Sequence, residues 1–213
     1  MAKNIDKNKF DTQFFERYAR ISLVDLVDER FAGLENKDRP DLQDDSQKVG
    51  IEVTRAIRQN KNVAHSLINE IAGKPIMNVS EEDWNDITKY GYGYGLNDNI
   101  IGKTEYIYWA TALPMKRIIS NKVSKVADGM YGEFDMYGLY VFVKENMNDK
   151  LVKQTIEYTI QLQKDNKLKY SFMYISQIHD LFVCDLIDSS FKKIEISKSQ
   201  CRKFYKEAIR IEN

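Results

Sequence analysis

The chain has 213 residues, 43% of them hydrophobic and 12% aromatic, which is typical of one globular domain with a full core and excludes a disordered chain. Its 32 basic and 32 acidic residues balance, so a nucleic-acid-binding surface could only be a local patch. No apolar run reaches the roughly 20 residues of a membrane helix, and the N-terminal residues lack the apolar stretch of a signal peptide. We therefore expect a cytoplasmic protein that does not contact membranes.

Few residues suit the commonest catalytic chemistries. The two cysteines, Cys184 and Cys201, lack metal-ligand spacing, and we expect both to be plain thiols in a reducing compartment. The two histidines, His65 and His179, provide little material for a histidine metal cluster or a Ser-His-Asp triad. Any active site therefore has to be built from other side chains.

The chain begins with a helical pattern. Apolar residues at helical spacing over 10–34, among them Phe14, Tyr18 and Leu23, predict a long amphipathic helix that is broken at most once. Its acidic residues are interpreted mainly as a solvated face, although any of them can point toward the segment that follows. These acidic residues are Glu16, Asp25, Asp28 and Glu29.

Residues 39–57 predict a β-hairpin. Asp41 follows Pro40 and opens a short strand, and the polar residues 44–48 form the turn. The second strand is Gly50-Ile-Glu-Val-Thr54, in which Ile51 and Val53 point to one face and Glu52 and Thr54 to the other.

This hairpin holds the two carboxylates that need a chemical explanation. A charge on the central part of an apolar strand, as at Glu52, is costly unless it is paired. On neighbouring strands Asp41 and Glu52 would repel each other, and a divalent cation would relieve that repulsion. The simpler alternative is that Asp41 caps a turn and Glu52 forms a salt bridge with a lysine or an arginine.

The next hundred residues are less uniform. Residues 60–72 predict a short helix that includes His65, and residues 73–114 are interpreted as an insertion on the domain. Within the insertion, the alternating Tyr-Gly run 90–95 is either a packed surface loop or a flap that stacks on bases. Residues 114–128 predict a helix that Gly129 ends, with Lys122 and Lys125 three positions apart on one face.

The C-terminal third completes an α/β pattern. Leu139–Val143 is a continuous apolar run and predicts a central strand that is covered on both faces. A helix over 149–164, strands over 170–175 and 181–187, an edge strand over 192–196 and a basic helix over 197–211 follow. The whole chain, 1–213, thus predicts a single α/β domain with a mixed central sheet flanked by helices.

The residues Arg39-Pro-Asp41 and Gly50-Ile-Glu-Val-Thr54 resemble the signature of the PD-(D/E)XK nuclease superfamily, which has the restriction-endonuclease-like fold. That signature is a Pro-Asp on one strand and a Glu-x-Lys on the next. The predicted order of elements up to about residue 176 is also similar to the core of that family: a helix, strands that carry the acids, a helix and a further strand.

The resemblance implies a metal-dependent nuclease that acts on DNA, with RNA as the less favoured substrate. Asp41 and Glu52 would be ligands of one or two divalent cations, Mg²⁺ or Mn²⁺, and the carbonyl of Val53 would complete the metal shell. A glutamate of the first helix often contributes as well, and Glu16 is the first choice for it, with Glu29 second. Many members dimerise to cut both strands, so the resemblance also allows a homodimer.

One residue departs from the family pattern. The signature lysine belongs at position 54, where this chain has Thr54, which can hold a water or a phosphate but carries no positive charge. Lys122 or Lys125 is the expected replacement, with Lys48 and Arg55 as further alternatives. The departure leaves two other functions open: an inactive nuclease-fold subunit for binding or assembly, and a protein-interaction domain.

Overall fold

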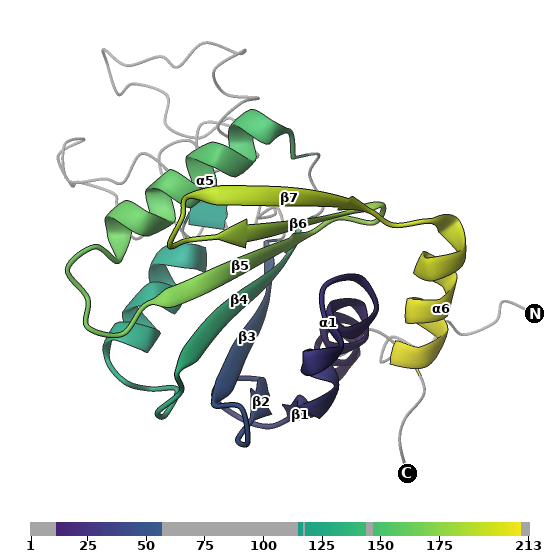
Figure 1. The fold of residues 1–213 in the computed structure, drawn as a ribbon, viewed down its shortest axis with the longest axis horizontal. Helices are drawn as coiled ribbons and strands as arrows, with labels where there is room; N and C mark the ends of the chain where they lie inside the picture. The colour runs from purple at the N-terminus through teal and green to yellow at the C-terminus, as the bar shows by residue number, and fades with distance from the viewer. Residues whose placement is uncertain (1–11, 57–114, 117, 144–146, 210–213) are drawn as a thin grey trace, which may run out of the picture.

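The computed structural model describes residues 12–56, 115–116, 118–143 and 147–209. These residues form an α/β fold in which a seven-stranded mixed sheet lies between two layers of helices (Figure 1). The sequence-based expectation of a mixed central sheet flanked by helices is therefore confirmed. The helix predicted over 60–72, with His65, and the predicted insertion over 73–114 lie outside the described residues.

The strands follow one another across the sheet in chain order. The three central strands are parallel and every other neighbouring pair is antiparallel. Leu139, Tyr140 and Val141 on the middle strand are fully buried, as the apolar run predicted. The strands are β1 (Glu35–Asn36), β2 (Leu42–Asp44), β3 (Val49–Ala56), β4 (Met136–Val143), β5 (Tyr170–Ser176), β6 (Asp180–Asp185) and β7 (Ser190–Glu195).

One face of the sheet is covered by the helical residues 115–116 and 118–127 together with α5 (Asp149–Leu162). Buried side chains of both helices, such as Val123 and Ile156, share one core cluster with Leu139 of β4. The first of these helices ends where predicted, since Gly129 takes a positive φ of 69°.

The opposite face is covered by α1 (Thr12–Leu26), the short 3₁₀ helix η1 (Glu29–Gly33) and α6 (Lys198–Ala208). The predicted long N-terminal helix is thus two pieces, because the carboxylate of Asp28 accepts a hydrogen bond from the backbone N–H of Arg30 and starts a new helix. No helix in the described ranges is long and apolar enough to cross a bilayer.

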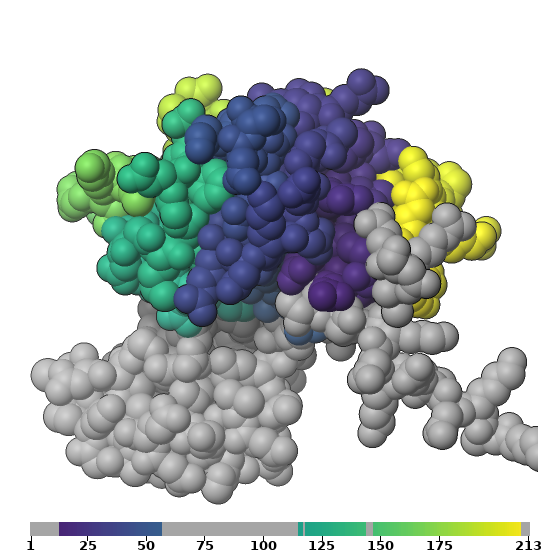
Figure 2. All heavy atoms as spheres, turned by 90° about the horizontal axis from the view of Figure 1, so that it is seen from below, coloured from purple at the N-terminus to yellow at the C-terminus, as the bar shows by residue number. Residues whose placement is uncertain are grey.

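The hairpin and the helix of residues 115–127 adjoin each other at one side of the molecule. In the view turned by 90°, the blue atoms of the hairpin lie between the teal atoms of residues 115–143 and the purple and yellow atoms of α1 and α6 (Figure 2). Residues that are far apart in sequence are therefore available to a common site there.

Gly50 allows the chain before β2 to pack closely against β3. A Cβ atom at this position would lie 2.8 Å from Cγ of Pro40 and 2.9 Å from Cδ2 of Phe134. Both rings therefore rest on bare backbone. Asp41 follows Pro40 directly, and β2 begins one residue later than predicted, at Leu42.

We expect Gly50→Ala to lower the free energy of unfolding by about 1–3 kcal/mol, because two rings have to move to admit a methyl group. Urea denaturation measures this difference. Gly138→Ala is the matched control, since its Cβ would lie 3.1 Å from Cγ1 of Ile51 and the loss should be smaller. Equal stability of Gly50→Ala and the wild type would contradict this packing.

Candidate functional site

The hairpin brings Asp41 opposite Glu52. The antiparallel register pairs Leu42 with Ile51, so Asp41, which directly precedes β2, lies beside the next residues of β3, Glu52 and Val53. The turn between the strands is capped by Asp44, whose Oδ1 accepts hydrogen bonds from Ser46 and Gln47. Asp44, and not Asp41, therefore caps the turn between the strands, whereas the other half of that alternative, a salt bridge from Glu52 to a lysine, is present.

Asp41 binds the backbone of the next strand. Its Oδ2 accepts a hydrogen bond from the backbone N–H of Val53 at 2.7 Å. Because the N–H and C=O of one strand residue point to the same side, the carbonyl of Val53 also faces the strand edge where Asp41 lies. A carboxylate and a carbonyl oxygen thus lie on one side of β3.

Glu52 points into the layer between the sheet and the helix of residues 115–127. It is buried, with 5% of its surface exposed, while Ile51 and Val53 belong to the core of the opposite face, so the predicted alternation is confirmed. Nζ of Lys122 donates a short hydrogen bond to Oε1 of Glu52. The pair is largely enclosed, since side-chain exposure is 18% for Lys122 and 7% for Glu52.

A third carboxylate approaches from α1. Glu16 is buried, and its Oε2 accepts a hydrogen bond from Nδ2 of Asn36 at 3.0 Å. The charge of Glu16 also raises the pKa of Asp41. Glu29, the second choice from the sequence, is exposed on η1.

The environment of Asp41 favours its protonated form. Burial is the largest cause, the charge of Glu52 is the second and that of Glu16 adds to them, while the N–H of Val53 and the ammonium of Lys122 act in the opposite direction. Together these effects raise the pKa of Asp41 to about 6.

Two tyrosines that carry no recognisable sequence signal, Tyr131 and Tyr170, complete the surroundings of Glu52. The hydroxyl of Tyr170 donates to the carbonyl of Lys122 at 3.5 Å. Tyr131 is 2% exposed, and its hydroxyl has no hydrogen-bond partner of good geometry among the described residues, although Glu52 and Tyr170 lie beside it and act on its pKa. Burial, with the nearby charge of Glu52, raises the pKa of Tyr131, so its hydroxyl stays protonated.

The other residues predicted for the site are placed differently. Thr54 is half-buried on β3, two residues beyond Glu52. Lys125 is exposed, so of the two helix lysines only Lys122 contacts the carboxylates in the described structure. Lys48 is exposed in the turn, and the guanidinium of Arg55 stacks over the ring of Phe15 on the opposite face, 4.6 Å from its centroid.

An apolar cavity of about 460 Å³ lies at the carboxyl ends of the parallel strands, on the side of α1 and α6. Its lining includes several aromatic rings, among them Phe14 and Phe142, and also Cys201. The Cys201 thiol donates to the carbonyl of Ile178 and lies 3.7 Å from Nδ1 of His179. Burial raises the pKa of this thiol, which opposes the nucleophilic thiolate form, and both cysteines are free as predicted.

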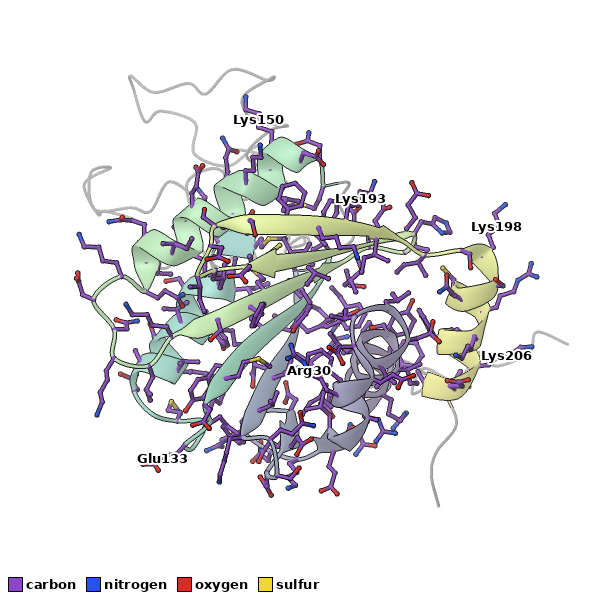
Figure 3. All side chains as sticks on the ribbon, viewed as in Figure 1. Arg30, Glu133, Lys150, Lys193, Lys198 and Lys206 are labelled. Carbon is purple, nitrogen blue, oxygen red and sulfur yellow. The ribbon has the colours of Figure 1, made fainter. Side chains whose placement is uncertain are left out.

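Basic side chains gather on β7 and α6. Lys198 and Lys206 point away from the body of the molecule (Figure 3), whereas the ammonium of Lys193 lies over the ring of Phe182 on β6. Two of the basic residues here are paired, Lys203 with Asp25 and Lys193 with Asp180, so the basic surface is modest.

We expect Lys122→Met to lower the free energy of unfolding by about 3 kcal/mol, because it leaves the buried Glu52 carboxylate without its partner. The double variant Lys122→Met/Glu52→Gln should recover most of this loss, since no unpaired charge remains. Chemical denaturation of the three proteins measures both effects. Lys125→Met, on the exposed side of the same helix, should stay within about 0.5 kcal/mol of the wild type. Failure of the double variant to recover stability would contradict a coupled pair.

The raised pKa of Asp41 predicts a pH-dependent stability. The folded protein binds the proton more tightly than the unfolded chain, so stability that is present below about pH 4 is lost as pH rises through 6. Asp41→Asn should therefore match the wild type near pH 3.5 and exceed it by about 1–2 kcal/mol at pH 7.5, allowing for partial exposure.

Asp44→Asn provides a control of opposite sign for this measurement. Hydrogen bonds from Ser46 and Gln47 hold the pKa of Asp44 below its ordinary value, so its charge stabilises the folded state above about pH 4. This variant should lose stability at neutral pH. A pH-independent effect of Asp41→Asn would show that Asp41 is not perturbed.

Within the described residues, no three side chains of the types His, Cys, Asp and Glu come close enough to form a metal-binding cluster. The chain matches no family model, and comparisons with curated proteins and with solved structures find no match either.

Proposed function

We propose that this protein hydrolyses phosphodiester bonds of nucleic acid in a reaction that depends on a divalent cation. DNA is the expected substrate and RNA the alternative, and the site would be of the PD-(D/E)XK type. The observation that carries the proposal is the contact between Lys122 and Glu52, beside Asp41. It supplies, from a separate helix, the positive charge that Thr54 does not provide.

The donor atoms suit a small, hard cation. The carboxylates of Asp41 and Glu52 and the carbonyl of Val53 are all oxygen donors, which Mg²⁺ and Mn²⁺ prefer. Mg²⁺ keeps several waters and is commonly held by only one or two protein carboxylates, so a cluster of three acidic side chains is not needed. The unpartnered hydroxyl of Tyr131 beside Glu52 also fits a polar ligand at this place.

The electrostatics agree with this assignment. The charges of Glu52 and Glu16 both act on Asp41, whereas the ammonium of Lys122 is paired with Glu52. The excess of carboxylates is relieved at Asp41 either by a proton, as its raised pKa indicates, or by a cation.

The residues of the chain would divide the work as follows. Asp41, held by the N–H of Val53, and Glu52 would bind the cation, and Glu16 would assist from α1. A divalent cation bound there lowers the pKa of a water and neutralises charge on the phosphate. The ammonium of Lys122 would turn from Glu52 to an oxygen of the scissile phosphate and stabilise the charge that develops on it. The hydroxyl of Thr54 would hold a water.

The order of elements supports the proposed restriction-endonuclease-like core. α1 precedes the hairpin that carries the acids, and the helix of residues 115–127 leads into β4, which lies parallel to β3. α1 covers one face of the sheet and that helix covers the other.

A second candidate function is an inactive nuclease-fold subunit that binds nucleic acid or supports an assembly. The observation that favours it is the ion pair itself, since Lys122 is engaged by Glu52 and position 54 has no charge. Such a protein would bind DNA with an affinity that falls steeply with salt. It would not cleave the DNA, whichever cation is added.

The experiment combines cation binding with cleavage. Calorimetric titration with Mn²⁺ and plasmid cleavage with Mg²⁺ or Mn²⁺ should be measured for the wild type, Glu52→Gln and Lys122→Met. We expect Glu52→Gln to lose at least about tenfold in Mn²⁺ affinity and all cleavage, because a ligand charge is removed. Lys122→Met should retain the cation and lose about 100-fold or more in cleavage rate.

Glu133→Gln is the control, because it removes one negative charge from an exposed turn and points away from the site (Figure 3). Cation binding that is equal in the wild type and Glu52→Gln would overturn the proposal. Binding of DNA without cleavage under any cation would support the inactive subunit. Capture of a protein partner with no DNA binding at low salt would support an interaction domain. Light scattering of the same samples tests whether the protein forms the homodimer that the family resemblance allows.

A further inference from the structure

Tyr131 is the feature that the proposed function leaves unused. In the described part of the chain its hydroxyl is the one buried side-chain oxygen or nitrogen without a hydrogen-bond partner. Such groups are rare in folded proteins because an unpaired buried hydroxyl loses its hydrogen bonds to water and gains none in return. An unpaired hydroxyl at 2% exposure therefore needs an explanation.

The position of this hydroxyl connects it to the carboxylates. Glu52 raises the pKa of Tyr131 both through its charge and as a neighbouring hydrogen-bond acceptor, and the charge of Asp41 raises the same pKa. Tyr131 lies in the turn between the helix that carries Lys122 and β4, so it approaches Glu52 from the same layer as Lys122. The hydroxyl thus borders the space where Asp41 and Glu52 would hold a cation.

A hydroxyl can donate one hydrogen bond and accept others. Glu52 is an acceptor only, so it can receive the Tyr131 proton but cannot satisfy the lone pairs of the phenol oxygen. A water in the hydration shell of a cation is a strong donor, and Mg²⁺ or Mn²⁺ bound by two carboxylates retains several such waters.

We propose that Tyr131 is a positioning residue of this site, whose hydroxyl accepts a hydrogen bond from a water of the bound cation and donates one to Glu52. The inference rests on the proposed function, because it requires a cation at Asp41 and Glu52. It goes beyond that function in assigning a role to a residue that is neither an acid nor a lysine.

The test compares Tyr131→Phe with Tyr140→Phe. Each variant removes one buried hydroxyl, but the hydroxyl of Tyr140 is bonded to Ser22 at 2.8 Å on the opposite face of the sheet. Without cation, Tyr131→Phe should be at least as stable as the wild type, because no hydrogen bond is broken, and Tyr140→Phe should be less stable. With Mn²⁺, Tyr131→Phe should bind about fivefold more weakly, the equivalent of one hydrogen bond, and Tyr140→Phe should bind as the wild type does.

A spectroscopic measurement separates this role from a purely structural one. Mg²⁺ binding should produce a tyrosine difference spectrum in the near ultraviolet for the wild type and for Tyr140→Phe, and this signal should be largely lost in Tyr131→Phe. Unchanged Mn²⁺ affinity and an unchanged difference spectrum in Tyr131→Phe, with a wild type that binds Mn²⁺ through Glu52, would overturn the inference and leave the proposed function standing. A wild type that does not bind Mn²⁺ would overturn both.

Discussion

The arrangement of the site depends on the burial of one carboxylate. Glu52 lies on the central part of a buried strand, where an isolated charge would be strongly destabilising, and the ammonium of Lys122 is the partner that makes its burial tolerable. This pairing fixes the helix of residues 115–127 against β3. The neighbouring Asp41 holds its proton more tightly, first because it is itself partly buried and second because the charges of Glu52 and Glu16 lie near it.

The position of the Lys122–Glu52 pair favours a functional role over a purely structural one. A buried Glu–Lys pair is in general weak evidence of stabilisation, because a well-packed apolar pair of the same size often serves the fold equally well. Here the pair lies beside Asp41, whose carboxylate accepts the hydrogen bond of the Val53 backbone N–H. The cost of burial is thus incurred beside Asp41, whose pKa the charges of both Glu52 and Glu16 raise.

Much of the fold could be predicted from local patterns. The alternation of Ile51 and Glu52, the apolar run of β4 and the glycine that ends the helix at residue 129 each follow from backbone geometry that a single segment determines. The sequence also allowed Lys122 to be selected as a candidate, but it could not show that Lys122 and not Lys125 reaches the site. Both lysines fall on one face by spacing, and only the packing of the helix against β3 leaves Lys122 largely enclosed and Lys125 exposed.

Other features had no local signal. Tyr131 lies in a turn without hydrophobic periodicity, so its approach to Glu52 depends on the path of the chain between two layers. The hydrogen bond from Asn36 to Glu16 joins a two-residue strand to a helix, and neither partner stands out in the sequence. The break after α1 follows from a side-chain cap at Asp28, which competes with a continuous helix in a way that apolar spacing does not reveal.

The parallel pairing of β3 with β4 also has a consequence for the order of folding. The strands β5, β6 and β7 are joined by short turns and pair with their immediate neighbours in the chain. Lys122 and Glu52, by contrast, are 70 residues apart in sequence, and their contact closes a long loop whose entropy must be overcome before the contact forms. The hairpins of the C-terminal half are therefore expected to form early, and the acidic site is expected to assemble late, when the two halves of the sheet join.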